Sequence, residues 1–173
     1  MDFEFVEKYK DCGLALPERA TQGSAGHDLA AAEDYIIPSY LNQMEGLRNF
    51  SSPYDMEKLA EITKKIKARP TLVSTGVKCD LQPGTYLELS IRSSVPLKYG
   101  LTLANGVGII DADYYNNPDN EGEIFLQIIN WGPSPVIVKK GTKLGQGVIK
   151  PYLLTESDNA TGERVGGFGS TNG

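Results

Sequence analysis

The residues best suited to chemistry stand within residues 104–132, which read ANGVGIIDADYYNNPDNEGEIFLQIINWG. Asp111 follows an apolar run broken by glycine, and Tyr114 comes soon after it. Residues 123–130 alternate apolar and polar side chains, as half-buried strands do, and the turn formers 116–120 lie in between. The pattern predicts a β-hairpin with Asp111 and Tyr114 at one end of a sheet, where the carboxylate could act as a general base beside a flat ligand. The alternative is an aspartate that hydrogen-bonds the backbone of its own turn.

A second candidate group follows the alternating residues 85–91, at the expected end of a strand. Arg92, Ser93 and Ser94 could bind phosphate, because a guanidinium fork is bidentate and hydroxyls and backbone N–H groups add donors. The alternative is a surface arginine followed by an ordinary serine turn. Asn105 offers both donors and acceptors to the edge of a base.

Two further candidates stand in other segments. Short residues precede Asp28 and allow a close approach of the backbone. The single histidine, His27, cannot form a histidine-rich metal site and is expected to be a packed loop residue. Gln146 lies in the expected strand 144–152, where it is either a ligand contact or a glutamine at the edge of the core.

The chain ends in the glycine-rich tail RVGGFGSTNG. Phe168 stands among glycines, near Arg164, Ser170 and Thr171. This composition suggests a segment that becomes ordered over a ligand, and the alternative is a frayed terminus.

The elements expected to position these residues are short strands. Further strands are predicted at 3–9, 34–38, 72–79 and 135–139. Residues 53–68 differ, since they follow a serine N-cap with proline at the first helical position and repeat apolar residues at helical spacing. We predict a helical insertion at about 41–69 in an otherwise β chain.

Composition bounds the class of protein. The chain has 173 residues, 40% of them hydrophobic, and a net charge of −5 at pH 7. We expect one globular domain, or one domain with an appendage, with no membrane span and no general nucleic-acid binding. Cys12 and Cys79 are too few for a disulfide framework, which favours a cytoplasmic protein with free thiols. An anionic substrate remains possible if a few arginines converge and a metal ion neutralises the remaining charge.

Five motifs occur in the order found in one known family. They are AGHDL (25–29), RSS (92–94), LANGVGIIDADY (103–114) with GEI (122–124), GTKLGQ (141–146) and RVGGFGST (164–171). On these motifs the chain resembles the trimeric dUTP pyrophosphatases (dUTPases), particularly those of Gram-positive bacteria and their phages. The resemblance implies an all-β fold, a distorted jelly-roll β-barrel over residues 1–163, and a flexible tail, 164–173, that closes over the active site.

The resemblance also implies a reaction, the Mg²⁺-dependent hydrolysis of dUTP to dUMP and pyrophosphate, which removes dUTP and supplies dUMP for dTMP synthesis. Asp111 would orient and deprotonate the water that attacks the α-phosphorus, and Asp28 would reach Mg²⁺ through water. The implied substrate contacts are the α- and β-phosphates for Arg92, Ser93, Ser94 and Gln146; the γ-phosphate for Arg164, Ser170 and Thr171; the uracil edge for Asn105 and the backbone at Gly108 and Ile110; deoxyribose for Tyr114; and uracil stacking for Phe168, beside Gly169.

The resemblance further implies a homotrimer with shared sites. Each site would take Asp28, Arg92 and Gln146 from one chain, Asp111 from a second, and Arg164 with Phe168 from a third.

The chain departs from the family pattern in several places. His27 replaces the more usual tyrosine, and the spacing from Arg164 to Phe168 is shortened. The hairpin carries extra residues, 115–121, and the insertion has no counterpart in the minimal family. Two alternatives remain open: a dCTP deaminase of the same fold, and a phage dUTPase-like protein that also binds a repressor through the insertion.

Overall fold

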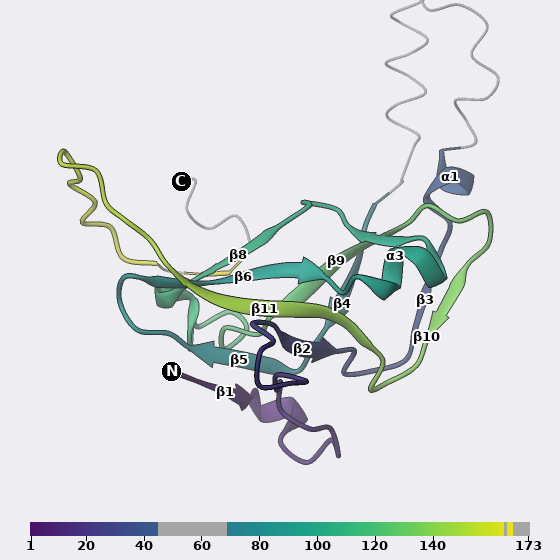
Figure 1. Cartoon of the computed structure of the whole chain (residues 1–173), viewed down its shortest axis with the longest axis horizontal. Helices are drawn as coiled ribbons and strands as arrows, with labels where there is room; N and C mark the ends of the chain where they lie inside the picture. Colours follow the sequence, from purple (N-terminus) through teal and green to yellow (C-terminus); the bar gives the residue numbers. More distant parts are fainter. Residues whose placement is uncertain (45–68, 165, 168–173) are drawn as a thin grey trace, which may run out of the picture.

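The computed structural model describes residues 1–44, 69–164 and 166–167, and its elements are mostly strands (Figure 1). The strands are β1 (Asp2–Phe5), β2 (His27–Ala30), β3 (Tyr35–Ile37), β4 (Thr71–Ser74), β5 (Val77–Asp80), β6 (Thr85–Ile91), β7 (Leu101–Leu103), β8 (Gly108–Asp111), β9 (Phe125–Asn130), β10 (Val136–Val138) and β11 (Lys143–Pro151). The short helices are η1 (Glu7–Tyr9), α1 (Tyr40–Gln43), α3 (Ser94–Tyr99) and η3 (Ala112–Tyr114). None of these helices is long and apolar enough to cross a membrane. This architecture confirms that the described part of the chain is mostly β.

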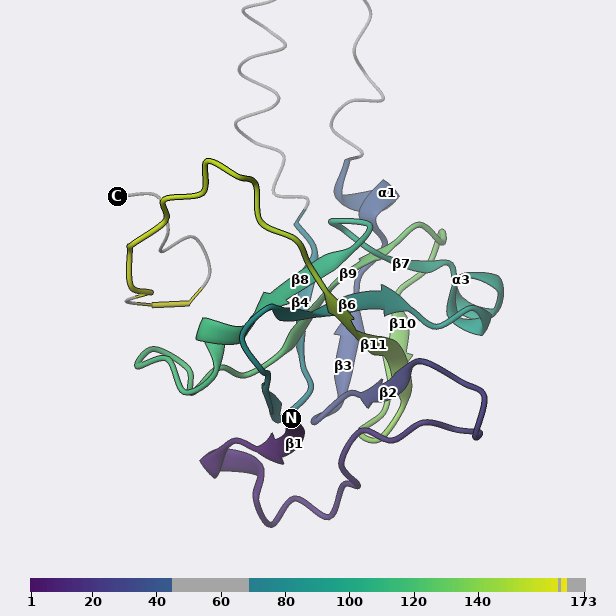
Figure 2. The ribbon, with the colours of Figure 1, turned by 60° about the vertical axis from the view of Figure 1, so that its left-hand side comes forward.

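Within the described residues the strands form four antiparallel sheets. The largest has the order β2-β11-β6-β8, and a second has the order β4-β9-β7. Two smaller pairs, β1-β5 and β10-β3, complete the arrangement. Figures 1 and 2 show β6, β8 and β11 running side by side, with β4 and β9 behind them in Figure 1 and β1 and β5 near the N-terminus.

The core lies between the two larger sheets. Leu87 of β6 and Leu126 of β9 have no exposed surface and belong to the same buried cluster. Leu87 and Leu89 are buried because alternate side chains of a strand point to the same face. A Cβ atom built on Gly145 of β11 would lie 3.0 Å from the Leu126 side chain, so the missing side chain lets the sheets approach closely.

The strand expected at 72–79 is interrupted, and this prediction was wrong in detail. Gly76, between β4 and β5, has φ +70, which an L side chain rarely adopts. A Cβ atom there would also lie 2.9 Å from the Tyr9 ring. The strand expected at 3–9 ends at Phe5, because its pairing with β5 stops at Val77 and the chain turns into η1, which buries Tyr9 under Gly76.

The predicted β-hairpin within residues 104–132 was also wrong. β8 pairs with β6, whereas β9 lies between β4 and β7 in the other sheet. Residues 112–124 therefore carry the chain from one sheet to the other. The strand periodicity is correct, but an alternating pattern does not specify which strand is the partner.

The remaining local predictions have mixed outcomes. Strands at 34–38, 85–91, 135–139 and 144–152 are confirmed by β3, β6, β10 and β11. The serine turn after β6 leads into α3, a helix that the sequence analysis missed. The helix expected at 53–68, and with it the surface suggested for a repressor, lies outside the described residues.

Candidate active site

Asp111 is the last residue of β8, and its carboxylate does not bond to its own turn. Asp111 occupies the N-cap position of η3 with extended backbone, yet its side chain makes no capping hydrogen bond. The carboxylate is 54% exposed. The alternative of a self-bonded turn aspartate is therefore wrong, and the strand end presents this carboxylate to a ligand.

A guanidinium group bridges two carboxylates at this position. Arg164 donates from Nη2 to Asp111 Oδ2 at 2.7 Å and from Nε to Asp113 Oδ1 at 2.8 Å. The Arg164 side chain is only 13% exposed, and its Cζ lies 5.6 Å from the centre of the Tyr114 ring. We call Asp111, Asp113 and Arg164 the carboxylate cluster. It brings the start of the tail onto the Asp111 turn.

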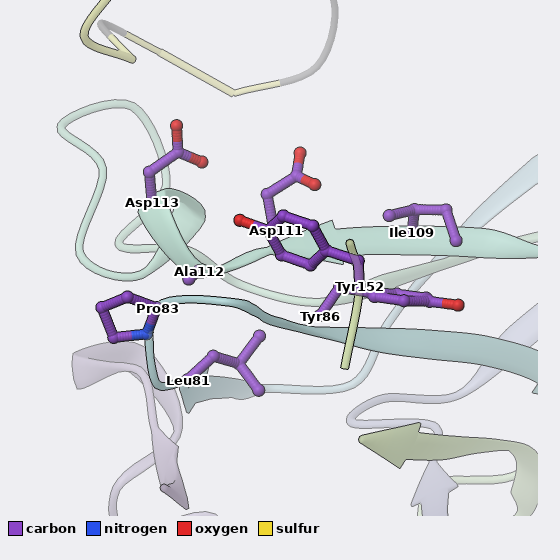
Figure 3. A pocket seen from close by; sticks show the side chains of 8 residues that line it. All are labelled: Leu81, Pro83, Tyr86, Ile109, Asp111, Ala112, Asp113 and Tyr152. Atoms are coloured by element: carbon purple, nitrogen blue, oxygen red, sulfur yellow. The ribbon is translucent and has the colours of Figure 1, made fainter. Parts of the chain in front are cut away.

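A pocket of about 800 Å³ opens beside this cluster (Figure 3). The residues that line it are Leu81, Pro83, Tyr86, Ile109, Asp111, Ala112, Asp113 and Tyr152. In Figure 3 the two aspartate carboxylates point to the same side, the Tyr152 ring is drawn beside Asp111, and the Tyr86 ring extends below Ile109. The pocket therefore combines an apolar wall with two carboxylates at its edge.

The sequence analysis missed the two tyrosines of this pocket. Tyr86 is directly opposite Asp111 in the β6–β8 pair, and its ring centre lies 6.4 Å from that of Tyr152. The outward positions of the alternating strand 85–91 were a signal that could have identified Tyr86.

Tyr114 lies beneath the carboxylate cluster. It is buried, its hydroxyl donates to the Glu123 carbonyl at 2.9 Å, and it accepts from Asn120 Nδ2 at 2.8 Å. Burial raises the pKa of Tyr114, so the phenol stays neutral at physiological pH. The ring thus supports Arg164 in the structure and is not among the pocket-lining residues.

A second cluster lies near the other end of the large sheet. Asp28 of β2 is opposite Gln146 of β11. The Oδ1 atom of Asp28 is 2.8 Å from Arg92 Nε, and the Oδ2 atom of Asp28 is 3.2 Å from Lys143 Nζ. We call Asp28, Arg92, Lys143 and Gln146 the Arg92 cluster. Two cations around one buried carboxylate leave this cluster net positive, as an anion site requires.

Close packing explains the small residues before Asp28. A Cβ atom on Gly26 would lie 2.5 Å from Gln146 Oε1 and 3.2 Å from Gln146 Cβ, so a larger residue there would require the Gln146 side chain to move. The His27 ring centre lies 5.3 Å from that of Phe3, so the residue is packed as expected, but it is the first residue of strand β2 and not a loop residue.

The other predicted site residues occupy varied positions. Ser93 precedes α3 and makes no side-chain cap bond. Asn105 is exposed in the β7–β8 connection. Its Nδ2 would lie 3.4 Å from a Cβ atom built on Gly108. Ile110 is buried in the core, so only its backbone could contact a ligand. The predicted tail residues Phe168, Gly169, Ser170 and Thr171 lie outside the described residues.

One chain does not bring the two clusters together. Asp111 is opposite Tyr86 near the start of β6, whereas Arg92 follows the last residue of that strand. At ~3.3 Å per residue the two positions are about 20 Å apart along the sheet. In contrast, Arg164 contacts Asp111 of its own chain, which differs from the expectation that they come from different chains.

Metal ligands are sparse in the described part of the chain. No group of three or more histidine, cysteine, aspartate or glutamate side chains there could hold a metal ion.

Comparisons with known proteins point in one direction. Residues 44–172 match the family model described as dUTPase. The deoxyuridine 5'-triphosphate nucleotidohydrolase of Lactococcus lactis is 40% identical over 171 residues, covering 98% of this chain and 95% of that protein. A dUTPase structure from Streptococcus mutans is 39% identical, with a TM-score of 0.71, and the match covers 91% of this chain and 100% of that one.

A more distant likeness concerns the fold alone. The dUTPase of phage phi11 of S. aureus is 18% identical, with a TM-score of 0.62, and the match covers 92% of this chain and 94% of that one. A mutant structure of the same phage enzyme coordinates a structural Mg(II) ion.

Proposed function

The chain belongs to the dUTPase family, and we propose that it hydrolyses dUTP to dUMP and pyrophosphate with Asp111 as the general base. The observation that carries this assignment is the Asp111 carboxylate, which is more than half exposed beside a pocket and makes no bond to its own turn. A carboxylate in that position can accept a proton from a nearby water molecule.

The chemical step is an attack of water on the α-phosphorus. The water oxygen forms a bond to phosphorus, the bond to the bridging oxygen of the β-phosphate breaks, and pyrophosphate leaves. Asp111 accepts a proton from the water and holds the water oxygen in line with the leaving group. The Asp111–Arg164 ion pair must loosen for this role, and the phosphates of the substrate offer the guanidinium an alternative anionic partner.

The Arg92 cluster is the proposed site for the α- and β-phosphates. Arg92 is one-third exposed and Lys143 nearly half exposed, so both cations are accessible to a ligand. Ser93, Ser94 and Gln146 would add neutral donors around the same anion. Binding here would be strongly charge-assisted.

Mg²⁺ is the proposed cofactor. The absence of a protein cage among the described residues fits this ion, which keeps several waters and binds substrate phosphates with one or two carboxylates. Asp28 would reach it through water, since each carboxylate oxygen can accept a further hydrogen bond beside its ion pair. When bound, Mg²⁺ would neutralise phosphate charge.

The proposed assembly is a homotrimer with shared sites, in which the four sheets close into a distorted jelly-roll barrel over residues 1–163. The separation of about 20 Å along the sheet between the backbone positions of Arg92 and Asp111 supports sharing, because two copies of the chain could bring these groups closer together than one chain does. Two copies of the chain would bring the Arg92 cluster of one to the carboxylate cluster of another.

Nucleoside recognition is proposed to involve the β7–β8 connection, Tyr114 and the tail. Asn105 would read the uracil edge together with the backbone at Gly108 and Ile110, and Tyr114 would exclude a 2′-hydroxyl. The tail, 164–173, would close the site, with Phe168 stacking on uracil. The burial of Tyr114 under Arg164 implies that the sugar meets this ring only after Arg164 has moved.

The test of this function is the release of pyrophosphate from dUTP, UTP, dTTP and dCTP, measured side by side. We expect hydrolysis of dUTP alone, and loss of that activity in Asp111→Asn. Release of ammonia from dCTP without pyrophosphate release from dUTP would instead support the deaminase alternative.

A further inference from the structure

The loop at 115–122, which joins η3 to β9, is a closely hydrogen-bonded turn built around Asn117. Asn117 is 5% exposed, and its Nδ2 donates to the Tyr114 carbonyl at 3.0 Å and to Asn120 Oδ1 at 2.7 Å. Its Oδ1 accepts from the backbone N–H groups of Asp119 at 3.1 Å and Asn120 at 3.3 Å. A buried amide whose donors and acceptor are all used fixes the conformation of the loop.

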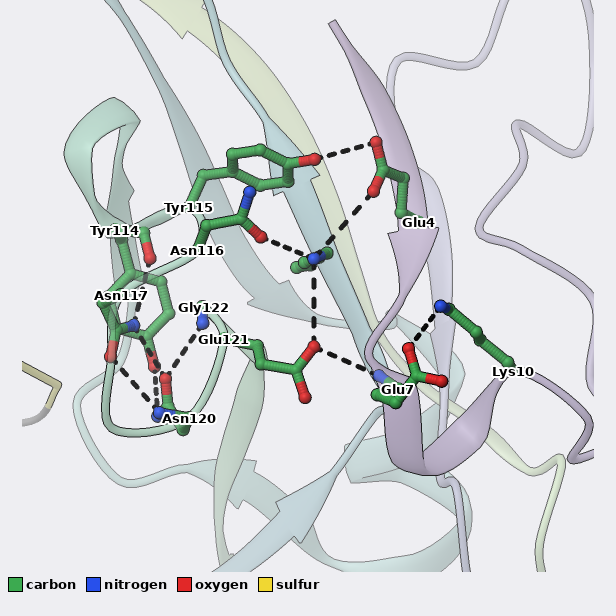
Figure 4. A network of polar contacts seen from close by, with 11 residues as sticks. Glu4, Glu7, Lys10, Tyr114, Tyr115, Asn116, Asn117, Asn120, Glu121 and Gly122 are labelled. Carbon is green, nitrogen blue, oxygen red and sulfur yellow. Dashed lines mark hydrogen bonds and ion pairs between the residues drawn. The ribbon is translucent and has the colours of Figure 1, made fainter.

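A second network connects the base of this loop to the β1–β5 pair (Figure 4). Lys78 of β5 is 11% exposed and donates to Asn116 Oδ1 at 2.5 Å. Its Nζ lies 4.0 Å from Glu4 and 3.9 Å from Glu121, and Tyr115 donates to Glu4 at 2.8 Å. The loop is thus anchored at both ends, and Asp119 at its tip has a defined position.

The tail meets the loop at Asp119. The Gly167 N–H donates to Asp119 Oδ2 at 2.8 Å, and Gly166 and Gly167 are buried. A Cβ atom on Gly167 would lie 3.3 Å from Asn120 Nδ2, so the loop surface fits a glycine backbone closely. Three residues before Gly167, Arg164 donates to the carboxylates of Asp111 and Asp113.

We propose that residues 115–122 form a docking seat for the C-terminal tail, and that Asp119 is its positioning residue. By accepting the Gly167 N–H group, the Asp119 carboxylate holds the start of the tail beside Asp111, where Arg164 can exchange its carboxylate partners for the phosphates of a substrate. The consequence for turnover rests on the proposed function, whereas the docking contact does not.

Limited trypsin cleavage after Arg164 tests the seat without reference to activity. Cleavage of a transiently open segment follows the population of the open form when opening is fast relative to cleavage. Removal of a charge-assisted acceptor in Asp119→Ala should therefore speed release of the peptide 165–173, measured by mass spectrometry, by about tenfold. Asp119→Asn keeps an oxygen acceptor at the same place and should stay within about threefold of the wild-type rate.

Asp158→Ala is the matched control. Asp158 is exposed on the same C-terminal segment, and its side chain makes no hydrogen bond or ion pair with the described residues. This variant removes the same charge and should release the peptide at the wild-type rate. The Tm of all three variants should equal that of the wild type, because an exposed loop aspartate contributes little to global stability.

The role in turnover has its own measurement. The kcat/KM for dUTP should fall by about tenfold in Asp119→Ala and recover in Asp119→Asn, in parallel with peptide release. Wild-type release from Asp119→Ala would refute the seat, and faster release with an unchanged kcat/KM would refute its role in positioning. If the wild-type protein does not hydrolyse dUTP, the proposed function fails while the trypsin result still decides whether Asp119 holds the tail.

Discussion

Two inactive variants should restore activity on mixing if their lesions lie on different chains of one site. Arg92→Gln removes a phosphate-binding charge, and Asp111→Asn removes the base. On one chain Asp111 lies opposite Tyr86 of β6, about 20 Å along the sheet from Arg92. Each variant alone should lose about 10²–10⁴-fold in rate if it removes a group required for the chemical step.

The expected recovery follows from a closed three-fold ring. Random equal mixing gives about three quarters mixed trimers, each with one site that takes Arg92 and Asp111 from unmutated positions. About a quarter of all sites should then be intact. The same count applies to either direction around the ring.

Asp111→Asn mixed with Arg164→Ala is the informative second pair. Arg164 contacts Asp111 of its own chain at 2.7 Å, so a site built this way always carries one of the two lesions and should recover nothing. A three-chain distribution would instead restore about a quarter of the sites for this pair too.

The assay requires dissociation and reassembly of the trimers, with a mass tag on one variant. Native mass spectrometry confirms the exchange, and pyrophosphate release from dUTP gives the activity. If exchange is complete and the Arg92→Gln and Asp111→Asn mixture stays as inactive as its components, the shared site is refuted.

Further predictions concern single positions. Asp111→Asn should keep nucleotide affinity while turnover falls about 10²–10⁴-fold, and near-normal turnover with unchanged binding would remove Asp111 from catalysis. Tyr114→Ala should lower the ratio of kcat/KM for dUTP over UTP, since the buried ring is proposed to exclude a 2′-hydroxyl, and an unchanged ratio would remove Tyr114 from the sugar pocket. Deletion of 166–173 should leave Tm nearly unchanged but sharply reduce activity, and full activity would show that the tail is only a terminus. Burial raises the pKa of Glu123 above its ordinary value of 4.5, so its contribution to stability is present below that pH and is lost as the pH rises through the folded pKa. Glu123→Gln should therefore have a Tm at pH 7 at least equal to the wild type and remove this part of the pH dependence, whereas a lower Tm would show that Ser74 and the Gly76 N–H stabilise the anion.

Local patterns were enough to locate much of the site. The alternation in residues 85–91 predicted β6, and the apolar run before Asp111 predicted a strand that ends at a carboxylate, as β8 does. The glycine before Asp28 predicted a close backbone approach, which Gln146 makes. These predictions succeeded because side-chain periodicity and backbone sterics act over a few neighbouring residues.

The sequence by itself therefore determined many of the strand positions and the chemical types of the candidate residues, through interactions between near neighbours. Only the tertiary structure decided that β8 pairs with β6 instead of β9. This pairing places Asp111 beside the start of β6, whereas Arg92 follows the end of β6. The tertiary structure also decided that Arg164 forms an ion pair with Asp111 and that Asp119 accepts a hydrogen bond from the Gly167 N–H group. Strand pairing and these contacts join residues far apart in the chain, and they depend on which faces can be buried together, a choice that no local periodicity contains.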